Sequence, residues 1–174
     1  KSQATAISEF LAAHDIPFLS SESLNLSHSK EVQFIIGLLR LVLDENNLEH
    51  RLTVLEFLRT DYGGEETYHD FISTHYRKSI QTILNVFEIG FNFSNFKAMS
   101  LYEAVEAVFY AFELSCSIDA HLQTFLDHVF EFSQQKHNDI LSFIMHWELQ
   151  GDSLYVATPK GINAIQVLTI HKAK

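Results

Sequence analysis

The sequence has little of what cross-links a chain, breaks a helix or spans a membrane. Among 174 residues there are one cysteine, two prolines and six glycines. Cys116 cannot form a disulfide within the chain, which excludes a disulfide-stapled scaffold and favours a reducing compartment. No apolar run approaches the roughly 20 residues that a membrane-spanning helix needs. We therefore expect a soluble, cytoplasmic protein that makes no contact with a membrane.

Positive charge is also scarce, and its distribution is uneven. The chain has 12 lysines and arginines against 22 aspartates and glutamates, which gives a formal net charge of -10. Residues 44–153 hold 6 of the basic and 18 of the acidic side chains, whereas residues 154–174 hold three lysines and no acid. Because proteins bind phosphate backbones through lysine and arginine, the central segment should repel nucleic acid. We expect it to act through its geometry or through a partner subunit.

Apolar residues are plentiful, at 47% of the chain, and most of them recur at helical spacing. The stripe from Val32 to Leu43 is broad enough to predict a helix that is buried on most sides. Ser100 and Glu103 have the spacing of a capping box, and Asn138 is expected to cap a later helix. Further apolar stripes at the same spacing run through residues 48–58, 68–76, 80–87, 101–112, 122–130 and 141–147.

The two ends of the chain have a different pattern. The apolar stretch Ile16–Leu19 predicts a strand after a first helix over residues 2–14, and residues 164–171 predict a terminal strand. Residues 154–157 are a further short strand candidate. We expect the first and last strands to be neighbours in one sheet, with the helices looping out between them. The expected fold class is mainly α: a multi-helix bundle with a small α/β portion formed by the N- and C-terminal segments.

The last residues carry the most specific motif. The segment Val167–Lys174 (VLTIHKAK) resembles the start of motif V in superfamily 1 DNA helicases of the UvrD/Rep and RecB/AddA kind. Residues 16–40 and 140–148 also resemble stretches of that family and occur in its order. Ser20-Ser21, where the UvrD/Rep branch usually has paired glycines, favours the RecB/AddA-like branch. The chain starts without an initiator methionine and stops directly after this strand, so we expect it to be a piece of a larger protein.

The resemblance implies a domain organisation and a function. Residues 1–29 would belong to motor domain 2A, residues 30–150 to a helical insertion like subdomain 2B, and residues 151–174 to motor domain 2A again. The parent protein would be an ATP-dependent helicase or helicase-nuclease that moves on single-stranded DNA in repair or recombination, with ATP and Mg²⁺ as cofactors. Thr169, His171 and Lys172 would lie on the DNA track. This chain has no phosphate-binding loop of the G-x-x-x-x-G-K-[ST] type, so we do not expect it to hydrolyse ATP alone.

Two other functions remain open. The first is a stand-alone helical interaction module whose end only resembles a helicase strand. The second is a metal-dependent phosphohydrolase, because His50, the dipeptide His69-Asp70, and Asp119 or Asp127 follow the order of its metal ligands. Ten histidines make such an order easy to find by chance.

The aromatic residues also have two interpretations. Most phenylalanines, together with Trp147, have core spacing. The segment Phe91–Phe96, with three aromatics among polar residues, is expected either to cap the core or to form an exposed patch.

Overall fold

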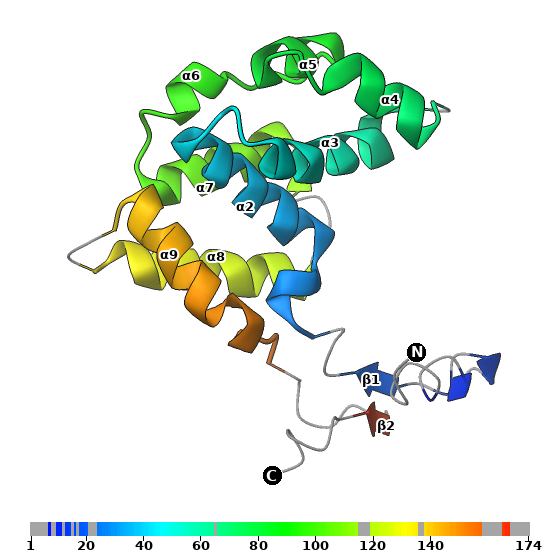
Figure 1. Cartoon of the computed structure of the whole chain (residues 1–174). Coiled ribbons are helices and arrows are strands. Elements are labelled where there is room, and N and C mark those ends of the chain that lie inside the picture. Colours follow the sequence, from blue (N-terminus) through cyan, green and yellow to red (C-terminus); the bar gives the residue numbers. More distant parts are fainter. Residues whose placement is uncertain are drawn as a thin grey trace.

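The structure is a helical body joined through two adjacent connecting segments to a small pair of strands (Figure 1). This computed structural model describes residues 7, 10, 11, 13, 14, 16, 18–20, 24–64, 66–114, 119–135, 138–157 and 165–167. In chain order its elements are β1 (Phe18–Ser20), η1 (Leu26–His28), α2 (Lys30–Leu43), α3 (Leu48–Tyr62), α4 (Tyr68–His75), α5 (Ile80–Val86), α6 (Phe93–Phe96), α7 (Leu101–Ala111), α8 (Ala120–Ser133), α9 (Ile140–Gln150), η3 (Gly151–Ser153) and β2 (Ile165–Val167). The mainly α, multi-helix fold is confirmed.

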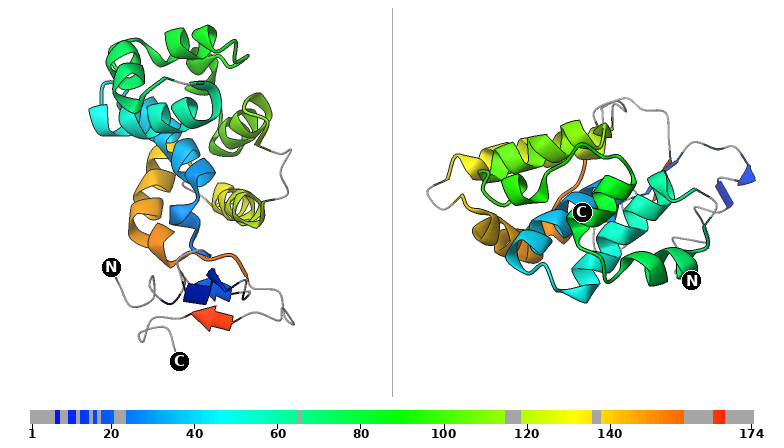
Figure 2. Two further views of the ribbon diagram at one scale, coloured as in Figure 1. Left: turned by 90° about the vertical axis from the view of Figure 1, so that its right-hand side faces the viewer. Right: turned by 90° about the horizontal axis from the view of Figure 1, so that it is seen from above.

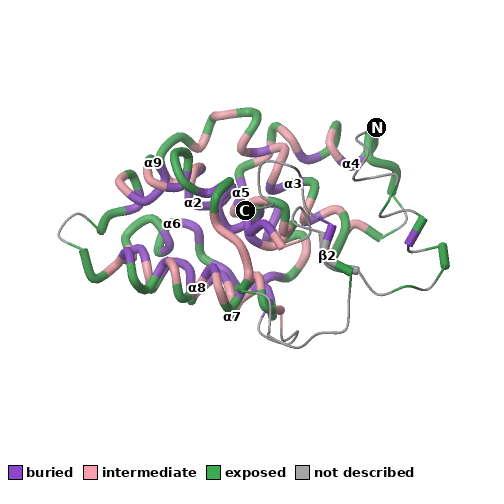
Figure 3. Tube along the Cα trace, turned by 90° about the horizontal axis from the view of Figure 1, so that it is seen from below, coloured by how far each residue is buried: buried purple, intermediate pink, exposed green. Residues whose placement is uncertain are grey.

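Helix α2 is the central element of the helical body. It packs against α3, α8 and α9, and its buried residues occur on nearly every side of the helix, as the sequence predicted. Gly37 lets α3 approach closely, because a Cβ at this position would stand 3.1 Å from Cγ2 of Val54. In Figure 3 the buried residues (purple) lie on the inward sides of the helices and the exposed ones (green) on the outward sides.

The helix ends follow their local sequence. Glu103 accepts hydrogen bonds from the backbone nitrogen of Ser100 at 3.1 Å and from its hydroxyl at 2.8 Å, so the carboxylate half of the predicted capping box is present. The prediction for Asn138 is wrong by one residue. Asp139 is the N-cap of α9, and its carboxylate accepts from the backbone nitrogen of Ser142 at 3.0 Å.

The first and last strands pair with each other, as the sequence predicted. β1 and β2 run parallel, with Phe18 opposite Ile165 and Ser20 opposite Val167. The left-hand view in Figure 2 shows this pair at one end of the helical body. Beyond this two-stranded pair, the predicted small α/β portion is not evident among the described residues. Residues 154–157 do not form the predicted strand and contribute only an isolated antiparallel bridge between Tyr155 and Asn25.

Two short segments form the neck between the strand pair and the helices: residues 24–26 and residues 154–156. Leu26 donates its backbone N–H to the carbonyl of Leu154 at 3.0 Å, and Val156 donates to Leu24 at 2.8 Å. The side chain of Asn25, which is only 5% exposed, donates to the carbonyl of Asp152 at 2.7 Å. The neck therefore holds the entering and the leaving chain together where they meet the helical body.

Candidate functional site

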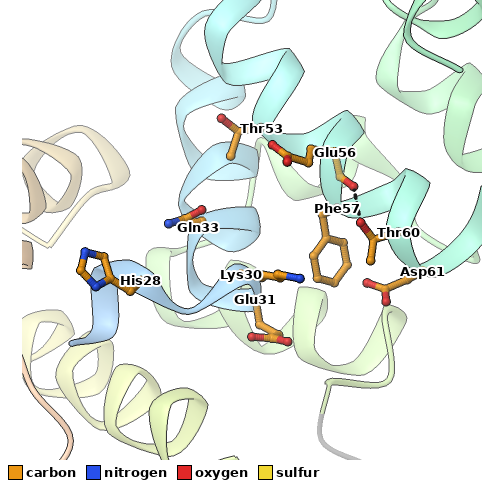
Figure 4. A pocket seen from close by; sticks show the side chains of 9 residues that line it. All are labelled: His28, Lys30, Glu31, Gln33, Thr53, Glu56, Phe57, Thr60 and Asp61. Carbon is orange, nitrogen blue, oxygen red and sulfur yellow. Dashed lines mark hydrogen bonds between the residues drawn. The ribbon is translucent and has the colours of Figure 1, made fainter. Parts of the chain in front are cut away.

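A cavity of about 450 Å³ lies between the start of α2 and one face of α3 (Figure 4). We call it the α2–α3 cavity. Its volume falls in the range of pockets that bind small ligands, roughly 300 to 1,000 Å³. The residues that line it are His28, Lys30, Glu31, Gln33, Thr53, Glu56, Phe57, Thr60 and Asp61.

One wall of the cavity is a single face of α3. Residues 53, 56, 57, 60 and 61 lie three or four positions apart, so the helix brings their side chains together. The hydroxyl of Thr60 donates to the carbonyl of Glu56 at 2.9 Å, and that of Thr53 donates to Glu49 at 3.2 Å. Because these hydroxyl protons are used within the helix, the threonines offer mainly acceptor oxygens to the cavity.

Phe57 is the aromatic residue of this wall, and its ring is held in place by a second aromatic ring in the core. It stacks on Phe34 with the ring centroids 4.0 Å apart and the planes inclined by 15°. Phe34 is fully buried and meets Phe112 edge-on at 4.7 Å. The cavity therefore has one flat apolar surface whose orientation is fixed by the core.

The lining of the cavity carries more negative than positive charge. Among the described residues that line it, the acidic ones are Glu31, Glu56 and Asp61, against a single lysine, Lys30. Burial raises the pKa of the Asp61 carboxyl above its ordinary value, the charge of Glu31 raises it further, and Lys30 lowers it. The net rise means that the attraction of Lys30 does not compensate for burial and like-charge repulsion at Asp61. An additional cation would relieve this repulsion, whereas a phosphate group would increase it.

The residues that the sequence assigned to the DNA track cannot be placed relative to this cavity. Thr169, His171 and Lys172 lie outside the described residues, as does Cys116. The nearest described element before them is β2, whose last residue is Val167.

The histidines and aspartates of the metal hypothesis are all described, and two of the aspartates have other roles. Within the part of the chain that the structure describes, no group of three or more His, Cys, Asp or Glu side chains could hold a metal ion. The carboxylate of Asp70 accepts a hydrogen bond from the hydroxyl of Thr67 at 2.6 Å, at the start of α4. Asp119 is the N-cap of α8 and accepts from the backbone nitrogen of His121 at 2.9 Å. The structure thus does not bring these residues together in a metal site.

The aromatic segment Phe91–Phe96 belongs to the core. Its three phenylalanines are at most 6% exposed. Gln81 fixes the segment by donating to the carbonyl of Phe91 at 3.0 Å and accepting from the backbone nitrogen of Phe93 at 2.8 Å. Trp147 is also buried, with its ring 5.4 Å from that of Phe125. Of the two interpretations of the aromatic segment, the core cap is confirmed.

No protein-family profile and no characterised protein matches the chain at a significant level. None of the described helices combines the length and the apolar character that crossing a bilayer requires.

The sequence analysis did not predict the α2–α3 cavity, although the polar face of α3 that forms one of its walls is visible in the sequence. The polar residues on α3 recur at helical spacing opposite the buried Val54, Leu55 and Leu58. That pattern is also typical of an ordinary solvated helix face. The concavity arises from the start of α2 lying beside this face, which spacing along one helix cannot predict.

Proposed function

We propose that this chain is the rear part of the second motor domain, with its inserted helical arm, of an ATP-dependent DNA helicase or helicase-nuclease of the RecB/AddA-like kind. The parent protein would act in the cytoplasm, in DNA repair or recombination. The sequence resemblance at the two ends of the chain and in α9 supports this proposal. The arrangement of the two strands supports it independently.

The observation that carries the proposal is the parallel pairing of β1 with β2. Parallel neighbours require a crossover connection, and here the whole helical body is that connection. Parallel sheets are normally covered on both faces and contain more than two strands. Ile165 in β2 is 49% exposed, so one side of this pair offers apolar surface that a larger sheet would bury. The pair therefore suits two neighbouring strands of a motor-domain sheet, with the helical body inserted between them in the chain.

The DNA-directed residues would follow β2 directly. In open α/β sheets, ligands bind in the crevice beyond the carboxyl ends of the strands. A strand that continues past Val167 would deliver Thr169, His171 and Lys172 into such a crevice. A threonine hydroxyl, an imidazole N–H and an ammonium group are all suitable donors to phosphate oxygens.

The part of the chain that the structure describes contains no group of three or more Asp, Glu, His or Cys side chains that could hold a metal ion. The sequence has no phosphate-binding loop of the G-x-x-x-x-G-K-[ST] type. We therefore derive no step of ATP hydrolysis from this chain. The nucleotide would be bound by other parts of the parent protein, and residues 30–150 would act as an acidic arm that contacts a partner subunit rather than DNA.

The test is a Thr169→Ala substitution in the full-length protein. Loss of one phosphate contact on the DNA track should reduce the DNA-stimulated ATPase rate about tenfold, equivalent to about 1.4 kcal/mol. Thr124→Ala is the matched control, because this threonine lies on α8 and its hydroxyl donates to the carbonyl of Ala120 within the same helix. Equal DNA stimulation in both variants would count against the helicase assignment.

A stand-alone interaction module is the second candidate, and the surface of α9 favours it. Leu141, Met145 and Leu149 lie four residues apart along the helix and are 53%, 59% and 85% exposed. Exposed apolar stripes of this kind are typical of helices that contact another protein. The coding sequence upstream of Lys1 separates the two candidates. A phosphate-binding loop of the G-x-x-x-x-G-K-[ST] type in the same reading frame would support the helicase.

A further inference from the structure

The α2–α3 cavity has three properties that together define the chemistry of an occupant. It has a flat aromatic surface, because Phe57 is stacked on Phe34. Carboxylates from two different helices line it, Glu31 from α2 and Glu56 and Asp61 from α3. The third property is that the ring and a carboxylate lie close to each other: Figure 4 shows Phe57 and Asp61, together with Lys30, at the same end of the cavity.

We propose that the α2–α3 cavity binds an arginine side chain carried by a basic segment of a partner protein. A guanidinium group is planar and permanently charged, so it can stack on Phe57 while it donates hydrogen bonds to carboxylates beside the ring. Lysine lacks the planar fork and keeps its hydration more strongly, so it matches this cavity less well. Phe57 is already held by its stacking on Phe34, which reduces the ordering cost of binding.

Charge complementarity identifies the partner as a basic protein segment. Residues 44–153 carry 18 acidic and 6 basic side chains, so a basic segment meets attraction well beyond the cavity itself. Glu31, Glu56 and Asp61 would repel the phosphates of DNA, RNA or a lipid headgroup. The carboxylate of Glu31 is held by a hydrogen bond from the hydroxyl of Ser29 at 2.7 Å, which keeps it at the cavity in the absence of a ligand.

This inference goes beyond the proposed function and does not depend on it. A helical arm of a helicase and a separate interaction module could both dock a partner here. Its test therefore uses binding to the 174-residue chain and requires no ATPase or helicase activity.

The probe is a short fluorescein-labelled peptide with two arginines, measured by fluorescence anisotropy at physiological salt. The same peptide with lysine or with uncharged citrulline in place of arginine provides the comparison. We expect the arginine peptide to bind at least threefold more tightly than the lysine peptide and at least tenfold more tightly than the citrulline peptide. Spermidine, a polycation without a planar group, should compete only weakly.

Asp61→Asn and Phe57→Leu test the site itself. Each should weaken binding of the arginine peptide about tenfold, and Phe57→Leu should also remove the preference for arginine over lysine. Glu131→Gln is the matched control for charge, because Glu131 is exposed on α8, outside the cavity. It should change the affinity less than twofold. Thermal unfolding of each variant identifies any that fail to fold, and Glu31→Gln then replaces it.

Three results would overturn the proposal. The first is an absence of binding by the arginine peptide at millimolar protein concentration. The second is an equal loss of affinity in Asp61→Asn and Glu131→Gln, which would show diffuse attraction to the acidic surface. The third is spermidine or the lysine peptide binding as tightly as the arginine peptide, which would identify the cavity as a general cation site.

Discussion

Arg51 is the most informative residue for testing how the helical body is held together. It lies on α3, is only 8% exposed, and donates to three backbone carbonyls. Its Nε donates to Tyr76 at 3.1 Å, one terminal nitrogen donates to Glu45 at 3.2 Å, and the other donates to Lys78. One side chain thus joins the loop before α3 to the chain that follows α4.

We expect Arg51→Met to lower the free energy of unfolding by about 3 kcal/mol. Each hydrogen bond from a charged donor contributes roughly 1.5 to 3 kcal/mol, so three would give an upper sum of about 4.5 to 9 kcal/mol. Removing the guanidinium also removes its desolvation cost, and water can reach part of the released carbonyls, which offsets a large share. Methionine keeps most of the aliphatic packing, so the loss measures the polar contacts.

Equilibrium unfolding in urea gives this value directly, with the slope against urea expected to stay unchanged. Arg77→Met is the control, because Arg77 is exposed and its guanidinium lies over the ring of Tyr76, 5.1 Å from the centroid. That contact contributes about 0.5 to 1 kcal/mol. Arg51→Lys should fall between wild type and Arg51→Met, since one ammonium cannot reproduce the three-way fork. Equal losses in Arg51→Met and Arg77→Met would refute the reasoning.

Two further predictions concern packing and pH. Gly151→Ala should destabilise the fold by about 1 to 3 kcal/mol in urea unfolding, because its Cβ would stand 2.9 Å from the ring of Trp147, whereas Gly90→Ala, where a Cβ meets nothing within 4 Å, should change stability little. Burial lowers the pKa of His128 below its ordinary value of 6.5. The unfolded chain therefore binds more protons there as the pH falls below about 6.5, so stability is full above that pH and declines toward the lower folded pKa. His128→Gln should flatten this decline between pH 7 and 5, and His69→Gln, at an exposed site on α4, should not; identical pH profiles for the two variants would contradict the assignment to His128.

The parts of the fold that the sequence predicted are those that depend on local spacing. The broad apolar stripe of α2 predicted burial on most sides, and its residues are buried in that way. The position of Asn138 shows the limit of such reasoning. Asn138 and Asp139 are equally good N-cap types, so the sequence could not decide between them, and the helix begins where the carboxylate of Asp139 reaches Ser142.

Other features depend on contacts between segments that are far apart in the chain. The strand predicted at residues 154–157 is a single bridge, because its hydrogen-bonding partner is the short segment 24–26. The α2–α3 cavity likewise requires Lys30 and Glu31 to lie beside residues on α3. Neither pairing leaves a periodic signal in the sequence, since both depend on how segments far apart in the chain lie against each other.

A short series of hydrogen bonds connects the α2–α3 cavity with the neck. Gln33 lines the cavity and donates to the carbonyl of Ser27 at 2.7 Å, so it joins α2 to η1. Ser27 in turn donates, through its backbone nitrogen at 2.8 Å, to the side chain of Asn25 in the neck. Two consecutive hydrogen bonds therefore connect a residue that lines the cavity with the neck, where the entering and the leaving chain meet the helical body.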